Sequence, residues 1–204
     1  MVRPTRREID DEIVDRAAEL FARHGVDQTS VQRIADAVGY SKTGLLHRFP
    51  TKEALRAAVV ERCTALVVQV RDAVAGAPPG PARDRAALDL LARTALDRPG
   101  FIALLLASLS ADGDGSPQHP LDDVAGVLGQ VFGTDLDPPA GHVPGAPDER
   151  AVRVVTALGG LAVAALACRG ADGDVRPALV RAACGALGHP GPTTDDHHQN
   201  PAHR

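Results

Sequence analysis

Apolar residues recur at helical spacing through most of this chain, and Gly, Pro and short polar runs separate the apolar stretches. The first such pattern predicts a helix over residues 8–24, which Gly25 ends. Its apolar face is formed by Ile9, Ile13, Ala17, Leu20 and Phe21. A longer pattern predicts a helix capped by Thr51 and ending near Ala75. At a rise of 1.5 Å per residue this helix would be roughly 35 Å long, enough to link two separate domains.

Between these two helices, the residues from 29 to 49 predict two short helices joined by a tight turn. Thr29 and Gln32 have the spacing of a capping box at the start of the first helix. Gly39 stands where a left-handed C-cap needs a residue without a Cβ atom, and Ser41 can cap the second helix. Two helices of about eight residues with a turn of about three make a helix-turn-helix, whose second helix usually enters the DNA major groove.

After a Pro- and Gly-rich loop at 76–81, five more helices are predicted, over residues 82–96, 99–110, 121–132, 150–169 and 175–187. We expect Asp174 to cap the last of them. The helix before it has no charge from Val154 to Cys168, so we expect it to be buried on every side, one face in its own domain and one against a partner subunit. This uncharged stretch has 15 residues, many of them Ala or Gly, which is too short and weakly hydrophobic for a membrane span.

These motifs make residues 9–60 resemble the DNA-binding domain of TetR-type (TetR/AcrR) transcriptional regulators. The resemblance rests on Leu20-Phe-Ala-Arg-His-Gly25, Thr29-Ser-Val31, Ile34-Ala35, Ser41-Lys42 and Phe49-Pro-Thr-Lys-Glu53. It implies an all-α fold, in which an N-terminal three-helix helix-turn-helix domain is joined by a long helix to a helical ligand-binding and dimerisation domain. The expected divisions are a DNA-binding domain at 1–52, an effector-binding and dimerisation domain at 53–190, and a disordered tail at 191–204.

The resemblance also identifies candidate DNA contacts. In TetR-like regulators the matching positions that commonly touch DNA are Thr29, Tyr40, Lys42, Thr43, Gly44, His47 and Lys52. By its chemistry Thr43 could contact a base edge or a thymine methyl group, whereas Lys42, His47 and Lys52 are suited to phosphates. The family usually has an aromatic residue at the position of Leu46 and often another at Arg48, so Arg48 is a candidate for an added phosphate contact.

The helices after residue 82 resemble the family's ligand-sensing and dimerising body in their layout. We expect the dimer interface to be formed by Ala157, Gly160, Leu161, Ala164, Cys168, Leu179 and Ala183, where small side chains allow helices to approach closely. We expect a pocket for a small hydrophobic effector to be lined by Leu88, Leu91, Phe101, Leu105 and Val127. The expected function is a ligand-responsive repressor that binds a pseudo-palindromic operator as a homodimer and is released by this effector.

The net charge of −4 conceals a local excess of positive charge. Residues 1–7 carry three Arg and no acid, and residues 28–56 carry five basic and two acidic side chains. The segment between them, residues 8–27, is acidic, with seven acids and two bases. A local patch, and not the total charge, determines attraction to phosphates, so the arm and the helix-turn-helix remain compatible with DNA binding.

Other functions are less well supported by the sequence. It contains no common catalytic motif, so we expect no enzyme activity. Cys63, Cys168 and Cys184 lack the spacing of a zinc site, and neither a metal nor a cofactor is expected. A thiol-redox-sensing regulator and a helix-turn-helix protein without an effector remain as alternatives. The Arg-rich start is not followed by an apolar run, so we expect a cytoplasmic protein.

Overall fold

The computed structural model describes residues 5–110, 122–136, 148–169 and 173–189. This part of the chain is all-α and contains no strand, as the hydrophobic pattern predicts. Its helices are α1 (Arg6–His24), α2 (Val31–Ala37), α3 (Lys42–Arg48), α4 (Lys52–Val74), α5 (Pro81–Asp97), α6 (Pro99–Ser110), α7 (Asp122–Phe132), α8 (Glu149–Ala167) and α9 (Arg176–Ala186). The expected tail at 191–204, with its three histidines, lies outside the described residues.

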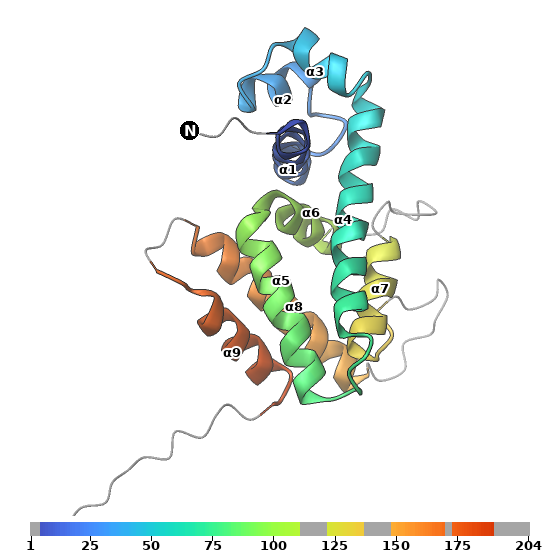
Figure 1. The fold of residues 1–204 in the computed structure, drawn as a ribbon, viewed down its shortest axis with the longest axis vertical. Helices are drawn as coiled ribbons and strands as arrows, with labels where there is room; N and C mark the ends of the chain where they lie inside the picture. The colour runs from blue at the N-terminus through green and yellow to red at the C-terminus, as the bar shows by residue number, and fades with distance from the viewer. Residues whose placement is uncertain (1–4, 111–121, 137–147, 170–172, 190–204) are drawn as a thin grey trace, which may run out of the picture.

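The helices form a small head and a larger body, which the long helix α4 connects (Figure 1). In the head, α1 lies between the α2–α3 pair and α6, which is the part of the body nearest to it (Figure 1). In the body, α5 packs on α8 and α9, and α7 packs along α4. The contacts of the head with the body include the continuous helix α4 and the packing of α1 on α6.

The buried apolar side chains form two clusters that divide α4 between them. The head cluster contains Leu55, Val59, Cys63 and Val67 of α4, whereas the body cluster contains Val70 and Val74. The head cluster also takes in Phe101 of α6 and Val124 of α7. The first four turns of α4 consequently pack with the head, although the sequence predicts that the effector-binding domain begins at residue 53. As predicted, Thr51 caps this helix, accepting a hydrogen bond from the Ala54 amide at 3.0 Å.

The caps of α1 and α9 differ from those that the sequence predicts. Helix α1 begins two residues earlier, at Arg6, because Thr5 and Glu8 form a reciprocal capping box. The Glu8 carboxylate accepts from the Thr5 amide at 2.6 Å, and the Thr5 hydroxyl accepts from the Glu8 amide at 3.3 Å. At α9 the N-cap is Val175 and not Asp174, although the Asp174 carboxylate still accepts from the Arg176 amide at 3.1 Å.

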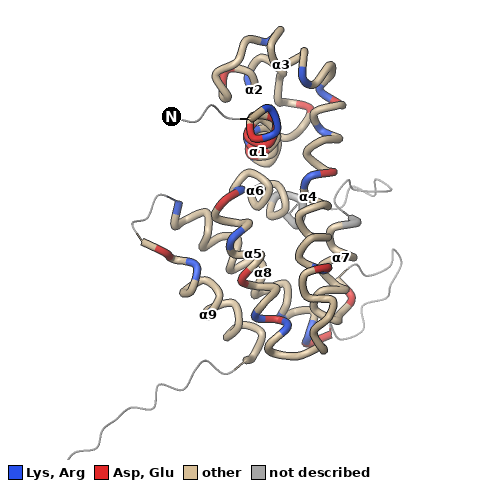
Figure 2. The backbone as a smooth tube through the Cα atoms, viewed as in Figure 1, with Lys and Arg blue, Asp and Glu red and all other residues tan. Residues whose placement is uncertain are grey.

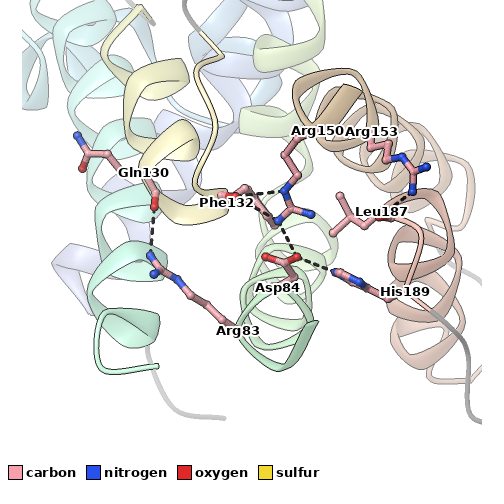
Figure 3. Close-up of polar contacts among 8 residues, drawn as sticks. All are labelled: Arg83, Asp84, Gln130, Phe132, Arg150, Arg153, Leu187 and His189. Atoms are coloured by element: carbon pink, nitrogen blue, oxygen red, sulfur yellow. Dashed lines mark hydrogen bonds and ion pairs between the residues drawn. The ribbon is translucent and has the colours of Figure 1, made fainter. Parts of the chain in front are cut away.

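A buried carboxylate joins three parts of the body (Figure 3). Asp84, in the first turn of α5, is only 2% exposed. It accepts a hydrogen bond from Arg150 Nη2 of α8 at 2.7 Å, and its Oδ2 lies 2.6 Å from His189 Nε2, just after α9. Arg150 also donates to the carbonyl oxygen of Phe132 at the end of α7. This arrangement ties α5, α7, α8 and the segment after α9 together at one end of the body.

Candidate nucleic-acid interface

Helices α2 and α3 form the helix-turn-helix, and three short-range interactions set its shape. Ser30 caps α2 by accepting from the Arg33 amide at 3.1 Å. Gly39 has a φ of 71°, the left-handed conformation predicted for this turn. Ser41 caps α3, as predicted, by accepting from the Gly44 amide at 3.0 Å. The start of each helix and the turn that ends α2 are therefore encoded locally by the sequence.

The predicted capping box at Thr29 and Gln32 is wrong. The cap is one residue later, at Ser30, and the Gln32 amide group donates to the Asp36 carboxylate at 2.7 Å instead of returning to the cap. Thr29 is fully buried, and its hydroxyl donates to the Gly25 carbonyl at 2.7 Å, just beyond α1. Its side chain thus holds the loop between α1 and α2, and it does not reach the surface where a phosphate could bind.

One side of α3 is exposed and polar. Lys42 and Thr43 lie in its first turn, His47 follows one turn later, and all three are exposed. The opposite side is fixed by Leu45, which is fully buried in the head cluster. Gly44 is half-buried, and a Cβ atom there would lie 3.1 Å from the Ser41 hydroxyl. The helix therefore presents a cation, a hydroxyl and an imidazole from a rigidly held backbone.

Comparison with known proteins agrees with this geometry. Residues 13–59 match the family model described as bacterial regulatory proteins, tetR family. Over 50 residues the chain is 42% identical to the HTH-type transcriptional regulator RutR of Escherichia coli K12, a match that covers 24% of each protein. The matched residues include α2 and α3 in full. Residues 13–59 of the head are therefore of the tetR-family type.

The likeness to TetR-family structures extends over most of the chain at the level of the fold. FadR of Bacillus halodurans, a fatty acid degradation regulator, has a TM-score of 0.53 and 18% identity, covering 91% of this chain and 96% of that one. PfmR of Thermus thermophilus has a TM-score of 0.51 and 18% identity, covering 87% and 97%. Identities this low show a shared fold. The sequence likeness to RutR, in contrast, spans about a quarter of the length of that relative.

Two of the candidate contacts in the TetR-type head are already engaged within the protein. Arg48 forms an ion pair with Asp10 of α1, and its guanidinium lies 5.9 Å from the centre of the Tyr40 ring. Lys52 Nζ donates to the carbonyl oxygens of Val26 at 2.9 Å and Asp27 at 3.2 Å. Arg48 therefore braces α3 against α1, and Lys52 holds the loop between α1 and α2 against the start of α4.

Asp10 is a structural residue of the head that the sequence pattern does not single out. It lies among the seven acids of residues 8–27, and periodicity alone does not distinguish it from its neighbours. Its pairing with Arg48, 38 residues away, depends on how α1 crosses α3. The presence of Arg at a position where the family often has an aromatic residue is the signal that could have prompted a search for an acidic partner.

The candidate dimer residues divide into two groups. Four of them are buried within the subunit: Ala157, Leu161, Leu179 and Ala183. Gly160 is exposed, and Ala164 and Cys168 are half-buried. Helix α8 is not buried on every side in the single chain, because Val152, Val155 and Val163 are 47%, 49% and 58% exposed. These three valines, with Gly160, define an exposed apolar face of α8, which is the face that the sequence analysis expects a partner subunit to cover.

By length and composition alone, α8 is long and apolar enough to cross a membrane, so the sequence argument that this stretch is too short and too weakly hydrophobic for a span is wrong. Only 28% of its apolar 18-residue stretch is buried within the chain, which is consistent with one packed face and one exposed face. Its packed face contacts α5, α6 and α9. Helix α8 therefore belongs to the helical body and presents its remaining apolar surface outward.

The candidate effector-pocket residues are divided between the two buried clusters. Leu88 and Leu91 belong to the body cluster, whereas Phe101 and Val127 pack in the head cluster. Leu105 packs against both clusters. A hollow of about 460 Å³ lies beside α7, and none of the predicted pocket residues is among those that line it: Gly126, Gly129, Gln130, Gly133, Thr134, Asp135 and Leu136. The predicted pocket residues are therefore core residues in this conformation.

Two of the three cysteines, Cys63 and Cys184, are in environments that suppress reactivity. Burial, together with the smaller effect of the neighbouring Asp15 carboxylate, raises the pKa of Cys63 to about 12. Burial also raises the pKa of Cys184, against the effect of Arg85. Because the thiolate is the reactive form, both thiols are held in their unreactive state at neutral pH. Among the described residues no group of His, Cys, Asp or Glu side chains is placed to hold a metal ion.

Proposed function

We propose that this chain is a transcriptional repressor that binds a pseudo-palindromic operator as a homodimer and is released by a small hydrophobic effector. The observation that carries the DNA-binding part is the exposed face of α3, with Lys42, Thr43 and His47 presented by a head of the TetR type. A recognition helix of this length reads only a few base pairs, which is too little for specificity in a genome. A two-fold dimer doubles the site and makes it pseudo-palindromic.

The roles of the α3 residues differ and can be separated by experiment. Lys42 is suited to a phosphate, so Lys42→Ala should weaken binding to all duplexes and reduce the slope of log affinity against log salt by about 0.9. Thr43 is suited to a base edge, so Thr43→Ala should change the ranking of duplexes, by about 1–3 kcal/mol at the base it contacts. Binding can be measured by fluorescence anisotropy on duplexes that the wild type selects from a random library.

Arg93→Ala is a matched control for Lys42→Ala, because Arg93 is an exposed cation on α5, in the body. It should leave both affinity and salt slope unchanged. A Lys42→Ala protein with wild-type affinity and salt slope would show that α3 does not meet the DNA backbone through this residue.

Dimerisation is supported by the exposed apolar face of α8. Three large aliphatic side chains within 12 residues of one helix leave apolar surface in water, which is unusual unless a partner covers it. The exposed Gly160 lies between Val155 and Val163 and would allow a second helix to approach closely. Sedimentation velocity on the full chain tests this: a dimer is expected at micromolar concentration.

Effector control is supported by the two-part architecture, in which one helix runs through both apolar clusters. A ligand can release such a protein from DNA only if it binds the DNA-incompetent conformation more tightly than the DNA-competent one. With two Phe and neither Trp nor Tyr after residue 76, the body is better suited to an aliphatic ligand than to a flat aromatic one. Screening aliphatic compounds by thermal shift, followed by titration of the DNA complex, tests this part of the proposal.

Two alternatives predict different behaviour of the DNA complex. An effector-free regulator would keep its DNA at every ligand concentration. A thiol-redox sensor would release DNA on oxidation, and the raised pKa values of Cys63 and Cys184 argue against it. Cys168, which is half-buried, is the thiol whose replacement by Ser would test this possibility most directly.

A further inference from the structure

Arg48, the last residue of α3, does not share the exposed polar side of that helix. It comes three residues after the buried Leu45, and residues three apart lie on the same side of a helix. Its side chain is 20% exposed and lines a hollow of about 290 Å³ that is bounded by α1, α3 and α4. Lys42 and His47, in contrast, are exposed. Arg48 is therefore directed toward α1, away from the surface that we propose for DNA.

Three contacts hold the Arg48 guanidinium in this place. It forms an ion pair with the Asp10 carboxylate, and its Nη1 donates to the carbonyl oxygen of Arg6 at 3.5 Å. Both of these partners belong to α1. The third is the ring of Tyr40, whose centre lies 5.9 Å from the guanidinium, within the range of a cation–π interaction. A DNA phosphate would have to replace these partners before it could bind Arg48.

The ion pair also changes the charge that the head offers to DNA. Attraction to the DNA backbone depends on cations that neutralise phosphates, and Asp10 already neutralises one of the five basic side chains of residues 28–56. In Figure 2 the acidic positions of α1 lie next to the helix-turn-helix. The Asp10 side chain is 33% exposed, and a pair that water reaches in this way adds little to stability. Its larger effect should therefore be on the binding of an anion.

We propose that Asp10 limits the affinity of this protein for DNA, because it holds Arg48 on α1 and so withholds one cation from the phosphates. This role rests on the proposed function, since it requires α3 to lie against DNA. It differs from the expectation, drawn from the sequence, that Arg48 adds a phosphate contact. The two roles have opposite consequences, because removing the Asp10 charge strengthens DNA binding only if Arg48 is otherwise withheld.

The test uses the full-length protein and two duplexes, one that the wild type selects from a random library and one with the same composition in scrambled order. Asp10→Asn should bind both duplexes more tightly and steepen the slope of log affinity against log salt by about 0.9, which corresponds to one added phosphate contact. Between about 50 and 200 mM salt, this variant should lose about threefold more affinity than the wild type loses. The gain should be equal on the two duplexes, because phosphate contacts carry no sequence information.

Three control variants separate the charge of Arg48 from other effects. Asp10→Asn/Arg48→Gln has neither charge but keeps two side chains that can form a hydrogen bond, so it should show the wild-type salt slope. Asp10→Glu retains the carboxylate and should show that slope as well. Glu12→Gln removes one acid from an exposed position of the same helix, outside the pair, and should leave the slope unchanged.

Two results would overturn the role of Asp10. One is an Asp10→Asn protein whose affinity is the same as or lower than that of the wild type, because Asp10 would then only support the fold of the head. The other is a double variant whose salt slope is shallower by about 0.9, because Arg48 would then contact a phosphate in the wild type. If Asp10→Asn fails to fold, as judged by far-UV circular dichroism, the slope of the double variant decides between the two roles.

The pair itself is tested without DNA, by a double-mutant cycle in urea denaturation. The double variant should lower the urea midpoint by less than the sum of the shifts caused by Asp10→Asn and Arg48→Gln, because each single variant leaves one charge without its partner. Additive shifts would show that Asp10 does not hold Arg48. If the wild type selects no duplex at all, the proposed function fails, and this cycle still decides whether the pair exists.

Discussion

Replacing Asp84 should destabilise the protein more than replacing any exposed acid, because the substitution leaves Arg150 without its buried counter-charge. The carboxylate is 2% exposed and accepts from Arg150 at 2.7 Å, with His189 at 2.6 Å from the same oxygen (Figure 3). In Asp84→Ala the Arg150 guanidinium keeps its hydrogen bonds to the Phe132 carbonyl but loses its counter-charge. Removing one member of a fully buried ion pair costs about 3–5 kcal/mol. Because the Arg150 side chain is 30% exposed, water can solvate it in part, and we expect about 3 kcal/mol, at the lower end of that range.

The assay is equilibrium urea denaturation followed by circular dichroism, at one fixed protein concentration because dimerisation contributes to the apparent stability. Glu149→Ala is the matched control: Glu149 pairs with Arg153 on α8 at 2.5 Å, but its side chain is 79% exposed. An exposed pair of this kind is worth about 0–1 kcal/mol. If Asp84→Ala lost no more free energy of unfolding than Glu149→Ala, the reasoning from burial would be refuted.

Three further predictions follow from individual contacts. Val163→Glu should convert the dimer to a monomer in sedimentation velocity with an unchanged helical circular dichroism spectrum, because Val163 is 58% exposed in the single chain; a dimeric variant would exclude this face. Thr29→Val should lower the free energy of unfolding of the head by about 1–3 kcal/mol, since the Gly25 carbonyl loses its buried donor, and unchanged thermal stability would contradict that role. Asp15→Asn should remove a pH dependence of the free energy of unfolding. Because the pKa of Asp15 is raised in the folded protein, the stability that this group contributes to the wild type falls as the pH rises above 3.8. The free energy of unfolding of the variant should therefore increase relative to that of the wild type as the pH approaches neutrality. A wild-type pH profile in the variant would show that Asp15 is not the titrating group.

The sequence predicts local features of this fold well, because those features depend on neighbouring residues. The cap at Thr51, the left-handed Gly39 and the cap at Ser41 all arise from interactions within a few residues, and all are confirmed. One exception is Asp174, since Val175 is the N-cap of α9. Another is Thr29, whose hydroxyl binds the carbonyls of Gly25 and Leu20 and leaves Ser30 to cap the helix. Thr and Ser at adjacent positions have similar capping chemistry, so periodicity alone does not decide between them.

Long-range pairing is where sequence reasoning is least informative. Asp84 and His189 are 105 residues apart, and Arg169 and Glu19 are 150 residues apart. A charged residue on a predicted helix is usually solvated, and only the packing of the helices shows that these are partly or fully buried. The same holds for Lys52, whose place in the family motif implies DNA contact, whereas its ammonium group binds two carbonyl oxygens of the head.

Footprinting of the full-length protein on duplexes selected from a random library tests the central claim most directly. If two copies of the chain each place α3 in the major groove, the protected site should be pseudo-palindromic, with two half-sites separated by about one helical turn, roughly 10 base pairs, or a multiple of it. Thr43→Ala should alter the preferred base at symmetric positions in both half-sites. A single asymmetric footprint bound by one chain, with Thr43→Ala showing the wild-type preference, would contradict both the dimeric arrangement and the assignment of α3 as the reading helix.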